Sequence, residues 1–205
     1  MDHIEKAKTE IRERWFENHK VKSIEGEKGL QRIIWGAEGT NMYQINYVLA
    51  GRNVFVSGDL GDAVYSLTCA ATLENIKDFN LSYFTKKLST SEHPKYDFDS
   101  KLAKAEIEEY FIDMCDVSDI NDLEEEDGEL FAELTSETEE WSTCDQFSTV
   151  IYSIYSNTSV DWFDSESASY VSDCGKKLSH ALISYWLGLQ MVIEQLEAKN
   201  NQGGD

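Results

Sequence analysis

The feature that most constrains the fold is a series of short β-type segments between residues 20 and 68, most of them closed by glycine. They are rich in β-branched and aromatic residues, and several alternate apolar with polar residues, as half-buried strands do. The glycine-bounded gaps favour hairpins, so the sequence predicts an antiparallel meander of four to five strands. The segments are KVKSIEG, LQRIIWG, MYQINYVLAG, NVFVSGD and AVYSLT; the last is either a fifth strand or the start of a helix capped by Asp62.

Helix-type periodicity lies on both sides of this block. Residues 2–19 are predicted to be a helix because Ile4, Ala7, Ile11 and Trp15 recur at helical spacing. Further helices are expected at 72–80, 81–89, 101–115, 122–141, 146–155 and 176–198. The last of these is apolar nearly all round, which is typical of a buried helix; a dimer interface is the alternative.

The order of helix, strands and then helices predicts an α+β fold. It would have an N-terminal helix, a small antiparallel β-meander and a mainly helical C-terminal half. We expect residues 1–70 to form the helix and sheet, residues 71–200 to form a helical part packed on them, and residues 201–205 to be a disordered tail. With 205 residues, 41% of them hydrophobic, the chain is long enough to bury a core.

The net charge of −21 is concentrated in one quarter of the chain. Residues 97–145 hold 19 Asp and Glu against two Lys, whereas residues 1–96 hold 13 charges of each sign. A negative field repels nucleic acids and anionic membranes and attracts basic surfaces. We therefore expect no direct nucleic-acid or membrane partner, and a protein partner with a basic surface.

The most acidic stretch is predicted to be an amphipathic helix over residues 122–141. Its apolar stripe consists of Leu123, Leu130, Leu134 and Trp141. Glutamates four residues apart form a ladder on another face, namely Glu125, Glu129, Glu133 and Glu137, with Glu126 and Glu140 beside it. The stripe indicates that this segment packs on the fold and is not a free linker.

The preceding helix repeats the scheme. Its predicted stripe is Ile107, Tyr110 or Phe111, and Met114. Its acidic edge consists of Glu106, Glu109, Asp113 and Asp116, and Asp119 and Asp122 continue this edge toward the next helix.

Two interpretations of these carboxylates stay open. Like charges at i and i+4 destabilise a helix by roughly 0.2–0.5 kcal/mol per pair, which favours a binding role that offsets the cost. The ladder also spaces carboxylates about 6 Å apart, close to two phosphate steps of about 3.4 Å, so it could mimic DNA. The alternative is a solvated acidic face without a partner. The predicted partner-binding residues are Glu106, Glu109, Asp113, Asp116, Asp119, Asp122, Glu125, Glu126, Glu129, Glu133, Glu137 and Glu140.

The residue spacings predict no metal site, no cofactor and no catalytic motif. The four histidines lack HxxxH or HExxH spacing, and the acidic run does not place calcium ligands in EF-hand order. SGDLGDAVYS lacks the lysine of a phosphate-binding loop, so we expect a hairpin or strand-to-helix turn there. We predict a protein that is not an enzyme; a polar cluster around Asp59, Asp62 and His180 would argue the opposite.

Cellular context is predicted from the cysteines and the N-terminus. Cys69, Cys115, Cys144 and Cys174 are widely spaced without CxxC, which indicates reduced core thiols; disulfides are the alternative. The charged N-terminus lacks the apolar region of a signal peptide, and the longest apolar run is too short to span a bilayer. We expect a cytoplasmic protein of a bacterial host cell, either a monomer or a homodimer.

The stretch NMYQINYVLAGRNVFVSGDLGDAVYSLT, residues 41–68, resembles small acidic proteins carried by phages and prophages of Firmicutes, including type II-A anti-CRISPR proteins that inhibit Cas9. The resemblance covers about a third of the chain and carries no functional residue. It implies a phage-encoded inhibitor whose partner could be Cas9 with its guide RNA. The alternative is an acidic adaptor or assembly protein that binds a partner through apolar contacts.

Overall fold

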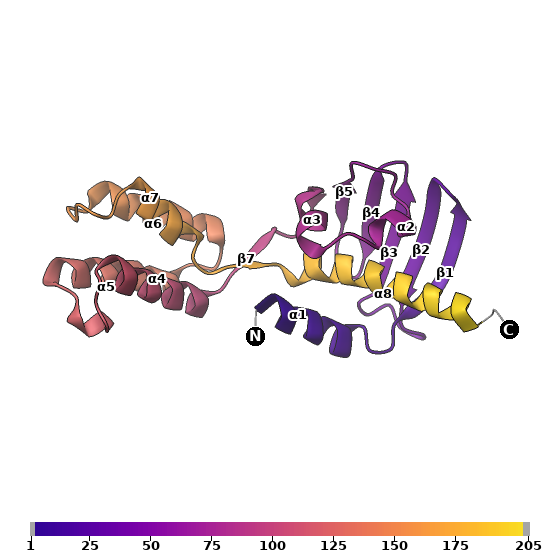
Figure 1. Cartoon of the computed structure of the whole chain (residues 1–205), viewed down its shortest axis with the longest axis horizontal. Helices are drawn as coiled ribbons and strands as arrows, with labels where there is room; N and C mark the ends of the chain where they lie inside the picture. Colours follow the sequence, from indigo (N-terminus) through magenta and orange to yellow (C-terminus); the bar gives the residue numbers. More distant parts are fainter. Residues whose placement is uncertain (1–2, 203–205) are drawn as a thin grey trace. The chain divides into compact units, whose positions relative to one another are not determined.

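The computed structural model describes residues 3–202 and shows an α+β fold (Figure 1). It divides into two compact units. The first, which we call the sheet unit, comprises residues 1–95 and 178–205; the second, the inserted unit, comprises residues 96–177. The inserted unit therefore interrupts the chain of the sheet unit between its last strand and its last helix.

The sheet unit is built on one antiparallel sheet of six strands in sequence order. The strands are β1 (Lys20–Glu27), β2 (Leu30–Gly36), β3 (Ile45–Ala50), β4 (Asn53–Gly58), β5 (Ala63–Ser66) and β6 (Leu88–Ser91). The expected meander is confirmed, and AVYSLT begins as its fifth strand. The sixth strand was not predicted, and its first two residues fall in the helix expected at 81–89. Its conformation depends on pairing with β5, which leaves no periodic signal in the sequence.

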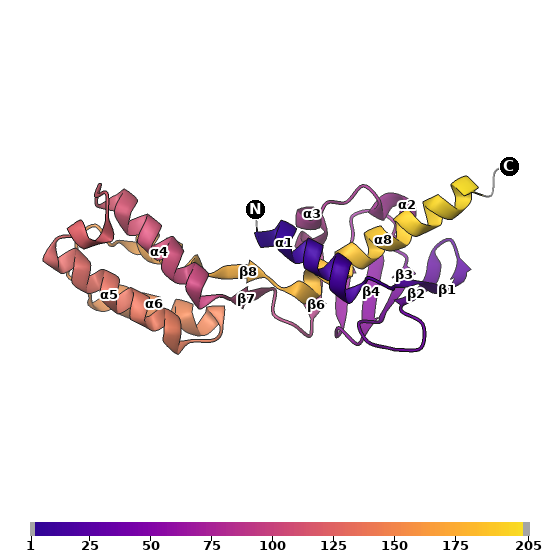
Figure 2. The same ribbon diagram turned by 90° about the horizontal axis from the view of Figure 1, so that it is seen from below.

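Helices cover one face of this sheet, and Figure 2 shows them together on that side. They are α1 (His3–Glu10), the π-helix η1 (Ile11–Trp15), α2 (Leu73–Ile76), α3 (Leu81–Lys86) and α8 (His180–Gln202). Thr72 and Asn80 cap α2 and α3 through their side chains. The predicted N-terminal helix is thus confirmed from His3 to Trp15 and ends four residues earlier than expected, and Asp2 lies outside the described residues.

Alternation along β3 shows how the strands build the core. Ile45, Tyr47 and Leu49 are buried, whereas the residues between them are half-buried. The Tyr47 hydroxyl donates a hydrogen bond to the carbonyl oxygen of Tyr185 in α8, at 2.9 Å. Gly188 makes this approach possible, because a Cβ atom there would lie 2.3 Å from the Tyr47 hydroxyl oxygen.

Helix α8 is the buried helix that its sequence predicts. It contributes Leu182, Ile183, Tyr185, Leu187, Leu189, Val192 and Ile193 to the core of the sheet unit. The helix starts at His180 and not at residue 176, because Lys176–Leu178 form a short strand, β8.

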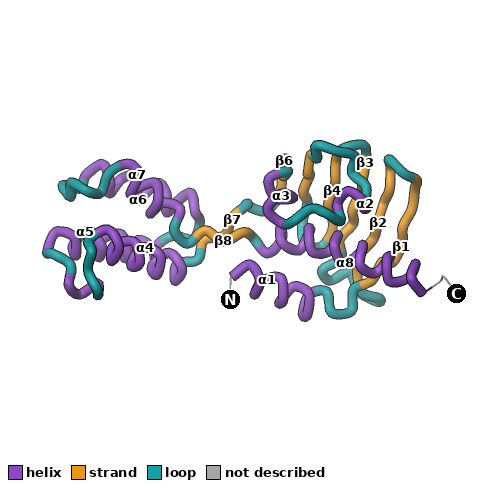
Figure 3. The backbone as a smooth tube through the Cα atoms, in the orientation of Figure 1, coloured by secondary structure: helices purple, strands orange, loops and turns teal. Residues whose placement is uncertain are grey.

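The inserted unit is mainly helical, as Figure 3 shows. It has its own hydrophobic core. Its elements are β7 (Tyr96–Phe98), α4 (Ser100–Met114), the 3-10 helix η2 (Ile120–Asp122), α5 (Glu125–Glu140), α6 (Cys144–Asn157) and α7 (Ser165–Asp173). Strand β7 pairs with β8 at the point where the chain enters and leaves. Phe111, Phe147 and Phe163 are its largest fully buried side chains.

The units differ from the ranges expected from the sequence. Residues 71–95 and α8 pack on the sheet, so the sheet unit extends well beyond residue 70. Residues 96–177 surround a separate hydrophobic core, which the sequence alone did not separate from the first. Of the expected disordered tail, Asn201 and Gln202 lie in α8, and residues 203–205 lie outside the described residues.

The glycine-punctuated stretch SGDLGDAVYS contains a β-hairpin turn, which is one of the two expected conformations. It joins β4 to β5, and Gly58 and Gly61 have φ angles of 141° and 87°, which favour glycine. All four cysteines are free, but only Cys174 is buried; the other three are half-buried, so the expectation of core thiols holds for one of them. Within residues 3–202, no helix combines the length and apolar character needed to cross a membrane.

Candidate acidic interface of the inserted unit

The negative charge of the chain belongs almost entirely to the inserted unit. Residues 96–177 hold 23 Asp and Glu against four Lys, whereas the rest of the chain holds 16 acidic and 14 basic residues. Two of those four lysines are engaged locally, since Lys176 pairs with Asp173 and Lys177 with Asp99. The inserted unit therefore produces a negative electrostatic field that its few lysines do not neutralise.

Helix α5 is amphipathic, as predicted. Leu130 and Leu134 are buried in the core of the inserted unit, and Leu123 and Trp141 pack against it. Of the four-glutamate ladder, Glu125, Glu129 and Glu133 are exposed.

The fourth glutamate of the ladder has a structural role. Glu137 is half-buried and accepts a hydrogen bond from Nε1 of Trp141 at 2.7 Å, four residues further along the chain. The solvent-facing ladder thus has three members and two like-charge i, i+4 pairs. Glu126 and Glu140 are exposed beside it.

Asp127, in the first turn of α5, fixes the packing of the inserted unit. Its carboxylate accepts a hydrogen bond from Nε1 of Trp162 at 2.8 Å and one from the thiol of Cys115 at 3.7 Å. Burial, with the Asp127 charge as the next contribution, raises the pKa of Cys115 to about 11. This thiol therefore stays protonated at neutral pH and is a poor nucleophile.

Helix α4 buries Ile107 and Phe111, as predicted. Tyr110 is half-buried and packs against the same core. Met114 was assigned to the same stripe, and this assignment is wrong because its side chain is 45% exposed. It lies in the last turn of α4, beyond the buried residues of that helix.

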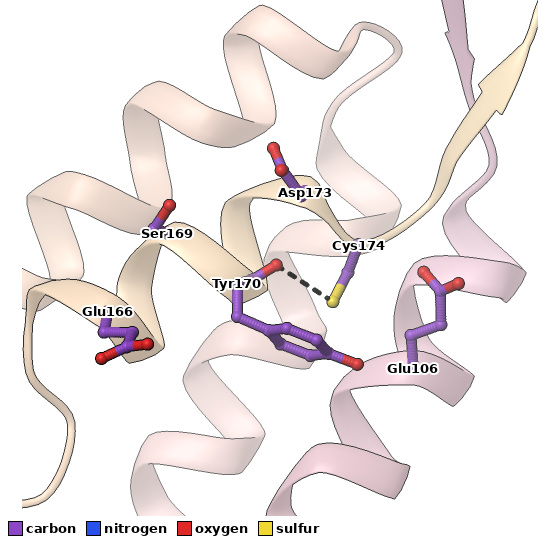
Figure 4. Close-up of a pocket in the computed structure, with 6 residues that line it drawn as sticks. All are labelled: Glu106, Glu166, Ser169, Tyr170, Asp173 and Cys174. Carbon is purple, nitrogen blue, oxygen red and sulfur yellow. Dashed lines mark hydrogen bonds between the residues drawn. The ribbon is translucent and has the colours of Figure 1, made fainter. Parts of the chain in front are cut away.

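The acidic edge of α4 meets α7 and forms two hollows that share Tyr170. One hollow, of about 450 Å³, is lined by Glu106, Glu166, Ser169, Tyr170, Asp173 and Cys174 (Figure 4). The other, of about 620 Å³, is lined by Glu109, Tyr110, Ile112, Asp113, Asp116, Val117 and Tyr170. We call these hollows together the α4–α7 acidic groove.

Two tyrosine rings form the centre of the α4–α7 acidic groove. The rings of Tyr110 and Tyr170 are stacked, with centroids 4.4 Å apart and an interplanar angle of 22°. Tyr170 is 48% exposed. Burial, together with Cys174, Glu106 and Glu109, raises the pKa of Tyr170, so its hydroxyl is neutral over the physiological range.

Glu106 is held in place at one end of this groove. Its carboxylate accepts a hydrogen bond from the backbone N–H of Gly175 at 2.7 Å. Gly175 has a φ of 77°, and a Cβ atom there would lie 2.7 Å from Cβ of Ala103, so the close turn requires glycine. The neighbouring Cys174 thiol has a pKa raised to about 12 by burial and nearby carboxylates, so it too stays protonated.

The structure brings together one part of the predicted set. Glu106, Glu109, Asp113 and Asp116 line the groove. Neither hollow of the groove includes a glutamate of α5, and within residues 3–202 no hydrogen bond joins the two sets. Asp119 caps η2, because its carboxylate accepts a hydrogen bond from the N–H of Asn121, and this bond lowers the pKa of Asp119. Asp122 is exposed in the same short helix.

Sequence reasoning missed the α7 side of the groove. Glu166, Tyr170 and Asp173 come from a helix that was not predicted, because SESASYVSD is polar and has few apolar residues at helical spacing. The signal that could have found it is Asp164, whose carboxylate accepts the N–H groups of Glu166 and Ser167 as a helix cap.

Within residues 3–202, no group of three His, Cys, Asp or Glu side chains converges to hold a metal ion. Asp59 and His180 have separate neighbours within the sheet unit. Asp59 accepts the N–H of Tyr43 at 2.7 Å, and the His180 ring lies 5.9 Å from that of Trp15. Within residues 3–202, no hydrogen bond joins Asp59, Asp62 and His180 to one another.

Comparisons with protein-family models, with curated proteins and with solved structures each find no match for this chain. The resemblance to type II-A anti-CRISPR proteins therefore stays a prediction from the sequence.

Proposed function

We propose that this protein is a phage-type inhibitor of a host defence protein that handles nucleic acid, and that the inserted unit is its binding module. The best candidate target is Cas9. The proposal rests mainly on the segregation of charge: 23 acidic residues against four lysines in residues 96–177, beside a nearly balanced sheet unit. A protein that needed charge only to stay dispersed would be served by mixed charges spread over its surface.

The proposed mechanism is electrostatic competition with DNA. Cas9 holds nucleic acid in a positively charged channel and reads its short recognition sequence through two arginines. The exposed glutamates of α5 stand about 6 Å apart along the helix, which is close to two phosphate steps on a DNA strand. We expect the carboxylates to occupy such a surface and to exclude DNA, without any catalytic step.

The test is inhibition of DNA binding by Cas9, with and without guide RNA, over a series of salt concentrations. We expect the affinity for Cas9 to fall about tenfold or more between low and high salt, because the contacts are charged and exposed. The triple variant Glu125→Gln, Glu129→Gln and Glu133→Gln should weaken inhibition.

A matched control removes three exposed charges from the sheet unit, through Glu13→Gln, Glu17→Gln and Glu27→Gln. Both triple variants change the net charge equally. If the α5 glutamates have a specific role in binding, only the α5 variant should weaken inhibition. Full inhibition by the α5 variant would show that the ladder does not mimic DNA. No binding to Cas9 or to a panel of other defence nucleases would overturn the proposal.

A second candidate function is an adaptor that binds its partner through apolar contacts. One observation favours it: the face of the sheet opposite α8 carries Phe55, 41% exposed, at a hollow of about 470 Å³ between β4, β5 and β6. Val48 and Val64 flank Phe55 across the strands. Binding that is insensitive to salt and is lost in Phe55→Ser would favour the adaptor over the inhibitor.

A further inference from the structure

The stacked tyrosines of the α4–α7 acidic groove have a geometry that the proposed function does not require. A surface that only imitates phosphates needs carboxylates, but here a half-exposed aromatic ring stands between them. Tyr170 is backed by Tyr110, with ring centroids 4.4 Å apart, and Tyr110 in turn packs against Trp162 at 6.3 Å. This backing fixes the plane of Tyr170 and leaves it at the boundary of two hollows.

The carboxylates around this ring are available to a ligand. Within residues 3–202, none of Glu106, Glu109, Asp113, Asp116 and Glu166 forms an ion pair; Asp173 alone among the lining carboxylates is paired, with Lys176. Glu106 keeps its position through the N–H of Gly175. Figure 4 shows the hydroxyl end of Tyr170 directed toward Glu106, with Glu166 on the far side of the ring.

An aromatic face bordered by carboxylates suits one side chain better than any other. The guanidinium group of arginine is planar, stacks on aromatic rings and donates paired hydrogen bonds to a carboxylate. The ammonium group of lysine is a compact and strongly hydrated charge that can lie over an aromatic ring, but it cannot stack flat on the ring or donate paired hydrogen bonds to a carboxylate. The hollow of about 450 Å³ also falls in the range of roughly 300–1,000 Å³ that is typical of ligand sites.

Other occupants fit the groove less well. A second copy of this chain would place the same acidic surface against itself in a two-fold dimer, which like charges disfavour. Phosphate groups of a nucleic acid would be repelled in the same way.

We propose that the Tyr110–Tyr170 pair and the carboxylates beside it form a binding site for an arginine side chain of the partner. This inference rests on the proposed function, since it specifies which basic surface the inserted unit recognises. The partner surface would be rich in arginine and not merely positive, and the groove would add specificity to an attraction that is otherwise non-specific.

The test uses the full-length protein and two fluorescein-labelled peptides of equal length and charge, one with six Gly-Arg repeats and one with six Gly-Lys repeats. Anisotropy at a fixed ionic strength should show at least about threefold tighter binding of the arginine peptide, because only arginine adds a flat stack and paired hydrogen bonds to the contact with the ring. The variant Tyr170→Leu should remove this preference and lower the affinity for the lysine peptide less than that for the arginine peptide.

Tyr152→Leu is the matched control, because Tyr152 is 43% exposed on α6 and lines neither hollow. Thermal unfolding of both variants checks that the inserted unit remains folded. Ring-proton shifts of Tyr110 and Tyr170 on addition of the arginine peptide give a second readout that does not depend on the variants.

Equal affinity for the two peptides, or an equal loss of preference in Tyr152→Leu, would overturn the arginine site and leave the inhibitor proposal standing. An arginine preference that depends on Tyr170, without any effect on nuclease activity, would support the site and overturn the inhibitor proposal. The two failures are therefore distinguishable.

Discussion

At the residue scale, Gly188 shows how a single missing side chain sets the distance between α8 and the sheet. A Cβ atom at this position would lie 2.3 Å from the hydroxyl oxygen of Tyr47, which is fully buried and bonded to Tyr185. Tyr47 has little room to move, because it lies on a central strand with buried neighbours along β3. Gly188 is therefore a packing requirement and not a flexible point of the helix.

We expect Gly188→Ala to lower the free energy of unfolding by about 1–3 kcal/mol, since overpacking a core exceeds the gain in helix propensity of about 1 kcal/mol. The control is Gly128→Ala in α5, where a Cβ atom would meet nothing within 4 Å. That variant should be stabilised by up to about 1 kcal/mol. Urea unfolding of both variants measures the difference, and equal changes of the same sign would contradict this account.

His19 predicts a pH dependence of stability. It is 9% exposed, its Nε2 lies 3.1 Å from the carbonyl oxygen of Tyr43, and its Nδ1 is buried without a partner. Burial is the main cause that lowers the pKa of His19 below its ordinary value. Below about pH 6.5 the unfolded chain therefore takes up a proton that the folded chain does not, and stability falls as the pH falls.

The measurement compares the free energy of unfolding at pH 7.5 and pH 5.5 in the natural chain and in His19→Gln. Glutamine keeps an N–H donor but does not titrate, so the variant should lose less stability on acidification. Other titrating groups are common to both proteins and cancel in the comparison. An identical loss in both would show that His19 does not contribute.

At the scale of elements, helix α5 combines a stabilising apolar stripe with a destabilising charged face. Glu129 stands four residues from both Glu125 and Glu133, and all three are exposed. Glu129→Gln removes two repulsive pairs and should raise the free energy of unfolding by roughly 0.4–1 kcal/mol at low salt. Stability gained together with weaker inhibition would identify the ladder as a feature retained for binding.

Glu108→Gln in α4 is the matched control for this change. Glu108 is also exposed and also carries one charge, but it stands four residues after Lys104, so its removal takes away an attraction. This variant should be neutral or slightly less stable in urea unfolding. A stabilisation as large as that of Glu129→Gln would mean that overall charge, and not the ladder, sets the effect.

The elements also show where sequence reasoning succeeds and where it fails. Segments with a strong period were predicted well: β2 matches LQRIIWG, and the stripe of α5 is in the core. Segments without such a period were not. Strand β6 and helix α7 are polar, and they take their conformation from pairing with β5 and from the Asp164 cap.

The candidate site was likewise predicted only in part. The acidic edge of α4 follows from its spacing, because one element determines it. The groove does not, because it needs α7 to bring Tyr170 and Glu166 beside that edge. Contacts between segments that are distant in the sequence leave no periodic pattern in either segment. The division into two hydrophobic cores could not be predicted from the sequence for the same reason.

At the scale of the whole molecule, the two units should respond differently to salt. The inserted unit carries 23 acidic residues and four lysines, so repulsion opposes its folding, whereas the sheet unit is nearly balanced. Raising NaCl from about 20 to 500 mM shortens the Debye length from tens of ångströms to a few and screens this repulsion. We expect the inserted unit to become more stable and the sheet unit to change little.

Thermal unfolding followed by residue-specific NMR distinguishes the units, since Trp141 and Trp162 belong to the inserted unit, and Trp15, Trp35 and Trp186 to the sheet unit. The indole signals of the first pair should disappear at a higher temperature in high salt. A shift of equal size for all five would contradict separate electrostatic control of the two units.

The chain enters and leaves the inserted unit at neighbouring points. Strands β7 and β8 pair there, and within the sheet unit the N–H of Ser179 donates to the carbonyl oxygen of Lys95 at 3.1 Å. The two points at which the inserted unit joins the sheet unit are thus linked by a direct hydrogen bond. Another folded module with equally close ends could therefore replace residues 96–177 without moving the strands and helices of the sheet unit, which makes this junction a natural point for exchanging the inserted unit.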